Sequence, residues 1–280
     1  MAMRSSPLIF AAEALAAPEG TVFVDTRPRE DWAKATIPGA TCLNVYDYFI
    51  AHSDERGIAA MVADARAAFR QLGLDRAPLV VFFEEQTGMR SPRGLWFHEL
   101  CGFDGGRILD GGLAAWRAAG GGTAAGAGAT GRIGDGDPAQ AGAFRSELVA
   151  ATAELLEPGA PELHVLDARR PAEWDGSYVH ACCARAGRIP GADLLFYEDL
   201  LQDGRYRSPD EIRRIAAAAG FGPGQRIVTY CHRGARAATT LYGLRSAGFD
   251  NVAIHPGSWH EWAGEPDLPA VEGTGAFVHR

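Results

Sequence analysis

The chain has 280 residues, of which 47% are hydrophobic and 22% charged, and its formal net charge is -8. This length is more than one typical hydrophobic core needs and fits two domains, while the apolar content excludes native disorder. The acidic balance argues against general binding to nucleic acid or to an anionic membrane surface, because both favour basic proteins.

The beginning of the chain is the first candidate element. Residues 4–17 faintly resemble a secretory signal, but Glu13 interrupts their apolar stretch and a similar segment recurs before the second half of the chain, where no signal can lie. We therefore expect a helix there. The five cysteines form no disulfide framework, and no apolar run reaches the roughly 18 residues of a membrane span, so we expect a cytoplasmic protein with reduced thiols and no membrane contact.

Predicted strands and helices occur in the same order in both halves of the chain. Each half has a short β-branched strand, a turn, helices, a buried strand, another helix and a last short strand. The expected strands are Val22–Val24, Leu79–Phe83 and Arg107–Leu109 in the first half, and Val165–Leu166, Arg226–Tyr230 and Asn251–Ile254 in the second. Alternating strands and helices predict an α/β fold in which each half is a mostly parallel sheet flanked by helices on both faces.

Sequence motifs repeat along with the elements, which identifies a tandem repeat. The shared motifs are Asp-x-Arg followed by an acid and Trp at 25–32 and 167–174, Ile-Pro-Gly-Ala at 37–40 and 189–192, and a gap-free alignment of 84–116 with 230–262. The second copy carries about ten extra residues between its first two motifs, as expected for a loop insertion.

The segment between the copies is rich in Gly and Ala, and its small side chains suit a flexible connection. We predict a first domain over 1–120, a linker over 121–143 and a second domain over 144–280.

Cys231 stands between a predicted buried strand and a predicted helix, in the sequence Cys231-His232-Arg233-Gly234-Ala235-Arg236. Ligands of open α/β sheets bind at the carboxyl ends of the strands, and a short loop there points its backbone N–H groups at one centre. Together with the helix dipole and the two arginines, these N–H groups favour a thiolate, which is the nucleophilic form of cysteine. Cys231 is therefore the predicted catalytic nucleophile.

Taken together, these motifs resemble the tandem-domain rhodanese family, the thiosulfate and 3-mercaptopyruvate sulfurtransferases, over nearly the whole chain. The segment Gly257-Ser258-Trp259-His260-Glu261-Trp262 adds to the resemblance. It implies that Cys231 takes a sulfur atom from a small-molecule donor, holds it as a persulfide within the loop 231–236, and passes it to cyanide or a thiol. No metal and no cofactor is implied.

The same alignment places Glu85 at the position of Cys231. A carboxylate cannot take up sulfane sulfur, so the first domain is predicted to be catalytically silent. Asp167 and Arg169 are predicted to form a structural ion pair near the end of a strand.

The choice of donor depends on cationic side chains near Cys231. Arg233 and Arg236 suit a dianionic donor through charge-assisted hydrogen bonds, and the resemblance implies substrate-binding arginines in the insertion, where Arg185 and Arg188 stand. Thiosulfate is the favoured donor. Glu173 occupies a position where mercaptopyruvate-type relatives often have arginine. A 3-mercaptopyruvate sulfurtransferase, or a persulfide relay that accepts sulfur from a protein partner, are the alternatives.

Two other interpretations of the cysteines are weaker. A cysteine phosphatase needs Cys-x5-Arg, whereas this loop has four residues between Cys231 and Arg236 and forms a smaller cradle. Cys182 and Cys183 lack the Cys-x-x-Cys spacing of zinc sites, so we expect an exposed loop thiol pair, with attack on the Cys231 persulfide as a further hypothesis.

Overall fold

The computed structural model describes residues 6–46, 48–134, 136–137, 142–156 and 163–273. Contacts between residues divide the chain into two compact units. The first unit comprises residues 1–48, 58–146 and 201–206, and the second comprises 49–57, 147–200 and 207–280.

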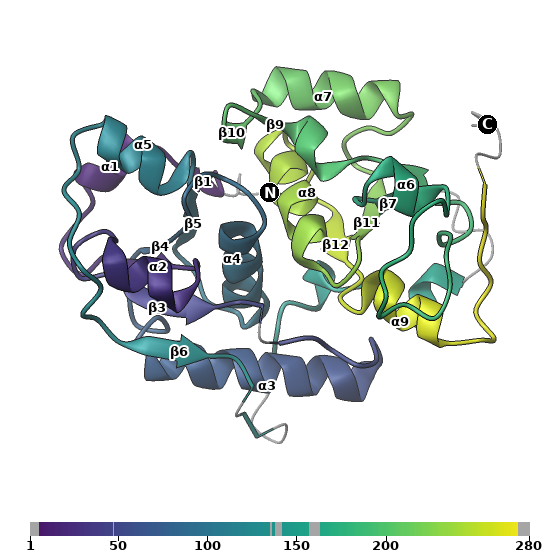
Figure 1. The fold of residues 1–280 in the computed structure, drawn as a ribbon, viewed down its shortest axis with the longest axis horizontal. Coiled ribbons are helices and arrows are strands. Elements are labelled where there is room, and N and C mark those ends of the chain that lie inside the picture. The colour runs from purple at the N-terminus through teal and green to yellow at the C-terminus, as the bar shows by residue number, and fades with distance from the viewer. Residues whose placement is uncertain (1–5, 47, 135, 138–141, 157–162, 274–280) are drawn as a thin grey trace. The chain divides into compact units, whose positions relative to one another are not determined.

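The first unit is built on a six-stranded parallel sheet with the order β1-β5-β4-β2-β3-β6 (Figure 1). Its strands are β1 (Leu8–Ile9), β2 (Val22–Asp25), β3 (Thr41–Asn44), β4 (Val80–Phe83), β5 (Gly106–Leu109) and β6 (Thr130–Arg132). Its helices are α1 (Ala11–Leu15), α2 (Arg29–Lys34), α3 (Glu55–Gln71), whose first three residues belong to the second unit, α4 (Arg90–Leu100) and α5 (Gly112–Ala118).

The side chains of β4 alternate between the two faces of this sheet, which shows why helices cover both faces. Val81 and Phe83 point into a core cluster that contains residues of α1 and α5. Phe82 points the other way, to the rings of Phe69 on α3 and His98 on α4, at centroid distances of 6.4 and 5.6 Å. Successive strand residues face opposite sides, so a fully apolar strand must be covered twice.

Part of the predicted linker belongs to the first sheet. Thr130–Arg132 forms β6 and pairs in parallel with β3, while Ala124 bridges to Thr36. Small residues permit this close approach, because a Cβ on Gly126 would lie 2.4 Å from the Trp32 ring. The flexible connection expected for this segment is thus, over these residues, an ordered edge of the sheet.

A second difference from the predicted boundaries concerns residues 201–206. They form a small antiparallel hairpin of β9 (Leu201–Gln202) and β10 (Arg205–Tyr206) that belongs to the first unit. Hydrogen bonds hold it there, among them one from Thr87 N–H to the Gly204 carbonyl oxygen at 2.9 Å and one from Tyr206 N–H to Asp110 Oδ1 at 3.0 Å.

The second unit has a four-stranded parallel sheet with the order β12-β11-β7-β8. Its strands are β7 (Leu163–Asp167), β8 (Asp193–Leu194), β11 (Arg226–Tyr230) and β12 (Val252–Ile254). The register pairs Tyr230 with Asp167, so the carboxyl ends of β11 and β7 meet at one edge. The residues that follow these strands are thereby brought together.

Among the described residues, the α-helices that complete the second unit are α6 (Pro171–Trp174), α7 (Pro209–Ala218), α8 (Ala235–Ser246) and α9 (Ser258–Gly264). Short 3-10 turns lie at 146–148 and 152–156, before β7, and at 197–200, between β8 and β9. The α/β class and the two parallel sheets confirm the sequence prediction, and the six expected strands are present within one or two residues of their predicted bounds.

Within the described ranges, no helix combines the length and the apolar character that crossing a bilayer requires. The cytoplasmic location stays a prediction.

Candidate active site

Cys231 follows the last residue of β11 and lies in the short loop before α8, with only 1% of its surface exposed. The backbone N–H of Gly234 donates a hydrogen bond to the Cys231 Sγ over 3.1 Å. Gly234 adopts φ +84°, a left-handed conformation that glycine takes without strain. The loop therefore directs a backbone donor at the sulfur atom, as the sequence predicts, and a negative charge on that sulfur is stabilised.

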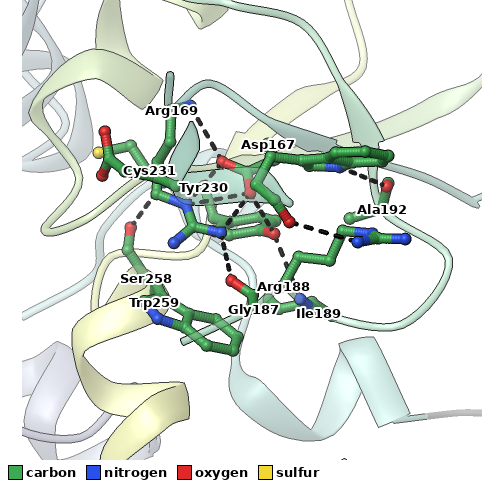
Figure 2. A network of polar contacts seen from close by, with 12 residues as sticks. Asp167, Arg169, Gly187, Arg188, Ile189, Ala192, Tyr230, Cys231, Ser258 and Trp259 are labelled. Atoms are coloured by element: carbon green, nitrogen blue, oxygen red, sulfur yellow. Dashed lines mark hydrogen bonds and ion pairs between the residues drawn. The ribbon is translucent and has the colours of Figure 1, made fainter. Parts of the chain in front are cut away.

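Ser258 holds the other side of the Cys231 backbone (Figure 2). Its hydroxyl accepts a hydrogen bond from Cys231 N–H over 3.1 Å and donates one to the His255 carbonyl oxygen over 2.9 Å. Trp259 N–H donates to the Cys231 carbonyl oxygen over 2.9 Å. Ser258 adopts φ +54°, an unusual value for a non-glycine residue. The hydrogen bonds of its hydroxyl with Cys231 and His255 hold it in this conformation.

Arg236 lies on the first turn of α8 and forms a bidentate ion pair with Glu173 on α6, at 2.6 and 2.9 Å. Glu173 is 1% exposed. Burial by itself would raise the pKa of Glu173, but the hydrogen bonds and the charge of Arg236 outweigh it and lower that pKa to about 2. The Arg236 guanidinium, which the sequence predicts to bind a sulfur donor, is thus engaged by a buried carboxylate.

His232 is held by two neighbours. Its ring stacks on that of His180 with a centroid distance of 4.1 Å and an interplanar angle of 4°, and its carbonyl oxygen accepts from His260 N–H over 3.0 Å. Burial, together with neighbouring His180 and Arg233, lowers the pKa of His232 to about 3. His232 is therefore neutral at neutral pH.

The two arginines of the insertion contact backbone carbonyl groups. Arg185 Nη2 donates to the carbonyl oxygens of Trp262, Glu265 and Leu268 at 2.7 to 3.0 Å. Arg188 donates to the Gly273 carbonyl oxygen over 2.7 Å, and its guanidinium lies 3.8 Å from the centre of the Trp174 ring. These contacts brace the chain after α9, and substrate binding by Arg185 and Arg188 stays a prediction.

Arg233, the remaining loop arginine, lies over an aromatic ring of the same unit. Its guanidinium carbon is 4.6 Å from the centre of the Phe49 ring, and Phe49 is 43% exposed. Such a contact keeps the cation ordered while it remains close to solvent.

Asp167 and Arg169 form the structural pair that the sequence predicts (Figure 2). Asp167 is fully buried and accepts from Arg169 Nε and Nη2 at 2.6 to 3.0 Å and from the Tyr230 hydroxyl at 2.6 Å. Arg169 also donates to the Gly187 carbonyl oxygen over 2.8 Å. The network ties the ends of β7 and β11 to the loop that carries the insertion.

The first unit repeats this geometry. Arg27 pairs with Asp25 at 2.6 Å, and Thr36 donates to the same carboxylate over 2.8 Å. The internal repeat thus extends from sequence motifs to individual hydrogen bonds.

At the position of the Cys231 loop, the first unit has a different set of contacts. The Glu84 carboxylate accepts from the N–H groups of Arg90 and Ser91 at the start of α4, at 2.8 and 2.9 Å. Glu85, which aligns with Cys231, pairs with Arg27 at 2.9 Å and with Arg117 at 2.6 Å. A carboxyl group of the chain itself therefore occupies the helix start in this unit.

Two cavities lie elsewhere. One of about 490 Å³ in the first unit is lined by Cys42, Arg90 and Arg132 among others, and one of about 420 Å³ in the second unit by His52, Glu261 and Glu265 among others. Cys231 is not among the described residues that line these two cavities. The backbone donor and the helix start identify the site.

The arrangement around Cys231 defines a class of protein. A cysteine at the carboxyl edge of a parallel sheet, with a backbone N–H on its sulfur and a helix beginning just after the loop, suits covalent transfer of a group that arrives and leaves on sulfur. Cys231 and the Gly234 N–H are the candidate nucleophile and hydrogen-bond donor for such a transfer.

Comparison with known proteins identifies the family. The model of the "Rhodanese-like domain" matches residues 11–119 and again residues 150–265, so the chain belongs to the rhodanese family and is a sulfurtransferase. A probable 3-mercaptopyruvate sulfurtransferase of Pseudomonas aeruginosa is 35% identical over 72% of this chain and 70% of its own length. A thiosulfate sulfurtransferase of the same species is 29% identical over 92% of this chain and 93% of its own length.

A solved structure agrees with this assignment. The crystal structure of a probable thiosulfate sulfurtransferase superimposes with a TM-score of 0.70 at 29% identity, covering 91% of this chain and 98% of that one. The tandem rhodanese resemblance drawn from the sequence is confirmed.

Sequence reasoning missed two residues that position the site. In the sequence, Ser258 stands out only as part of a motif, and Glu173 only as a departure from mercaptopyruvate-type relatives. Glu173 could have been found from its place in the repeated motif after Asp-x-Arg. Its partner Arg236 could not, because it lies 63 residues further along the chain.

Proposed function

We propose that the protein transfers sulfane sulfur from thiosulfate to cyanide or a thiol through a persulfide on Cys231. The observation that carries the proposal is the hydrogen bond from Gly234 N–H to the Cys231 Sγ, at the start of α8. The same donor would remain beside the additional sulfur atom after transfer, where the negative charge then lies.

The reaction has two displacements. The Cys231 thiolate attacks the outer sulfur of thiosulfate, the S–S bond breaks, and sulfite leaves with the bonding electron pair. The acceptor then attacks the outer sulfur of the persulfide, and the Cys231 thiolate is restored. The electrons balance over the two displacements, so neither step calls for a metal or a cofactor.

Two cations of the loop support thiosulfate as the donor. Arg233 lies over Phe49, and Arg236 uses two of its five N–H groups on Glu173, which leaves other N–H groups for an anion. A dianionic donor gains more from such groups than a monoanionic one. The relatives include both thiosulfate and 3-mercaptopyruvate sulfurtransferases, and 3-mercaptopyruvate is the alternative donor.

The test compares both donors at steady state with cyanide as the acceptor. We expect wild type to have the higher kcat/KM with thiosulfate, Cys231→Ala to be inactive, and Arg236→Gln to lose about 10- to 100-fold in kcat/KM for thiosulfate. Cys42→Ser, in the first unit, is the matched thiol control and retains activity. A preference for 3-mercaptopyruvate would overturn the choice of donor but not the nucleophile.

A persulfide relay makes a different prediction. If thiosulfate and 3-mercaptopyruvate are both turned over slowly while a protein persulfide loads Cys231 rapidly, the physiological donor is a protein partner. Mass spectrometry of the chain after each donor, which detects one added sulfur on Cys231, distinguishes the two cases.

A further inference from the structure

Two cysteines and one histidine meet beside the Cys231 loop. The Cys182 Sγ lies 3.3 Å from the His232 Nε2, and the ligand atoms of Cys182, Cys183 and His232 all lie within 4.8 Å of one another. Cys182 is exposed, and the other two residues are half-buried. His232 comes from the loop after β11, whereas the cysteines come from the insertion that distinguishes the second copy of the repeat.

The three residues are held in place by the surrounding structure. Cys183 N–H donates to the His180 carbonyl oxygen over 2.8 Å, and Cys183 packs against the core cluster that contains Trp259. The His232 ring stacks on His180, whose Nε2 lies 3.0 Å from Glu173 Oε1. Little reorganisation is therefore needed to bring the three ligand atoms to one centre.

We propose that Cys182, Cys183 and His232 bind a thiophilic d10 metal ion of the Zn²⁺ type. Two sulfur ligands and one imidazole nitrogen form a donor set that zinc accepts, and the exposure of Cys182 leaves a fourth position open to water or a thiol. Binding displaces the two thiol protons into solvent, and no electrons are transferred. Metal binding at this site is a property additional to sulfur transfer, and it does not depend on which sulfur donor the enzyme uses.

Metal binding at this position has a consequence for the neighbouring site. His232 directly follows Cys231, so an ion shared with Cys182 and Cys183 ties the active-site loop to the insertion. We expect the metal-loaded protein to transfer sulfur more slowly and to recover its rate when a chelator removes the ion.

The test titrates the full-length, reduced protein with Zn²⁺ against a chromophoric chelator in the absence of oxygen. Wild type is expected to bind one Zn²⁺ per chain with a Kd below about 1 µM. Cys182→Ser/Cys183→Ser and His232→Asn are expected to weaken binding at least ~100-fold. His260→Asn is the matched histidine control, and Cys231→Ala the thiol control, and both should bind as wild type does.

A second measurement does not depend on variants. Zn²⁺ should protect Cys182 and Cys183 from alkylation in the wild-type protein, as peptide mass spectrometry reports, and Cd²⁺ should give a sulfur-to-metal charge-transfer absorption. The proposal would be overturned if the double cysteine variant bound Zn²⁺ as tightly as wild type. It would also be overturned if Cys231→Ala lost Zn²⁺ binding, because the ion would then be bound by the catalytic thiol. Absence of protection at both cysteines would overturn it as well.

Discussion

Arg236 and Glu173 form a bidentate ion pair at the end of the loop that carries Cys231, with N–O distances of 2.6 and 2.9 Å. The loop arginine is thereby fixed before any donor arrives, and its charge is partly compensated. In the proposed function, specificity for an anionic donor then depends on the remaining N–H groups of the guanidinium, while the stability of the site depends on a buried carboxylate.

This pair makes stability dependent on pH. The pKa of Glu173 is lowered in the folded chain from 4.5 to about 2, so its stabilising effect is complete above pH 4.5 and is lost as the pH falls towards 2. The shift corresponds to about 3 kcal/mol. Glu173→Gln should cost about that amount of unfolding free energy at neutral pH, and the gap to wild type should narrow at about pH 3.

Urea unfolding at both pH values measures the effect, with the exposed Glu19→Gln as control. A gap between wild type and Glu173→Gln that is independent of pH would show that the carboxylate charge does not stabilise the fold.

Ser258 is expected to act as a positioning residue for Cys231. Both Ser258→Ala and Ser258→Gly remove the hydroxyl that accepts from Cys231 N–H, and should lower kcat roughly tenfold with little change in KM. Because Ser258 has φ +54°, the alanine variant should be about 1 kcal/mol less stable than the glycine variant.

Steady-state kinetics and thermal unfolding of both variants separate the two effects. Equal stability of the alanine and glycine variants, or a change in KM alone, would contradict this role.

The repeated Asp-Arg pairs permit a matched comparison between the units. Asp167→Asn leaves the buried Arg169 without its carboxylate and should destabilise the second unit by about 3–5 kcal/mol, whereas after Asp25→Asn the buried Arg27 keeps its ion pair with Glu85 and the first unit should lose less. We expect only Asp167→Asn to lower the activity per folded molecule, because its network holds the end of β11 next to Cys231. Activity normalised to the folded fraction from circular dichroism provides the measurement, and an equal loss in both variants would refute the distinction.

The first unit should stay silent even with a cysteine at the aligned position. In Cys231→Ala/Glu85→Cys, the Glu84 carboxylate still accepts from the N–H groups of Arg90 and Ser91, so the start of α4 is occupied and a negative charge lies nearby. We expect no persulfide after incubation with thiosulfate. Detection by mass spectrometry of one added sulfur on the thiol introduced by Glu85→Cys would show that this one position makes the difference between the units.

Much of the fold was predictable because its signals are local. The strand ending at Tyr230 was predicted with its observed bounds, since a run of β-branched and apolar residues followed by a glycine-containing loop is recognisable without tertiary information. Within the predicted linker 121–143, Thr130–Arg132 instead forms a strand, because small residues suit both a flexible segment and close packing, and only the presence of the β3 edge decides between them.

The sequence by itself therefore determined the tandem repeat, the α/β class and the position of Cys231 between a strand and a helix, because these depend on neighbouring residues and on similarity between the two halves. Only the tertiary structure decided that Arg236 meets Glu173 and that His232 meets Cys182. These partners are 63 and 50 residues apart, and no local propensity specifies such contacts. They arise because parallel strands carry distant loops to the same edge of the sheet.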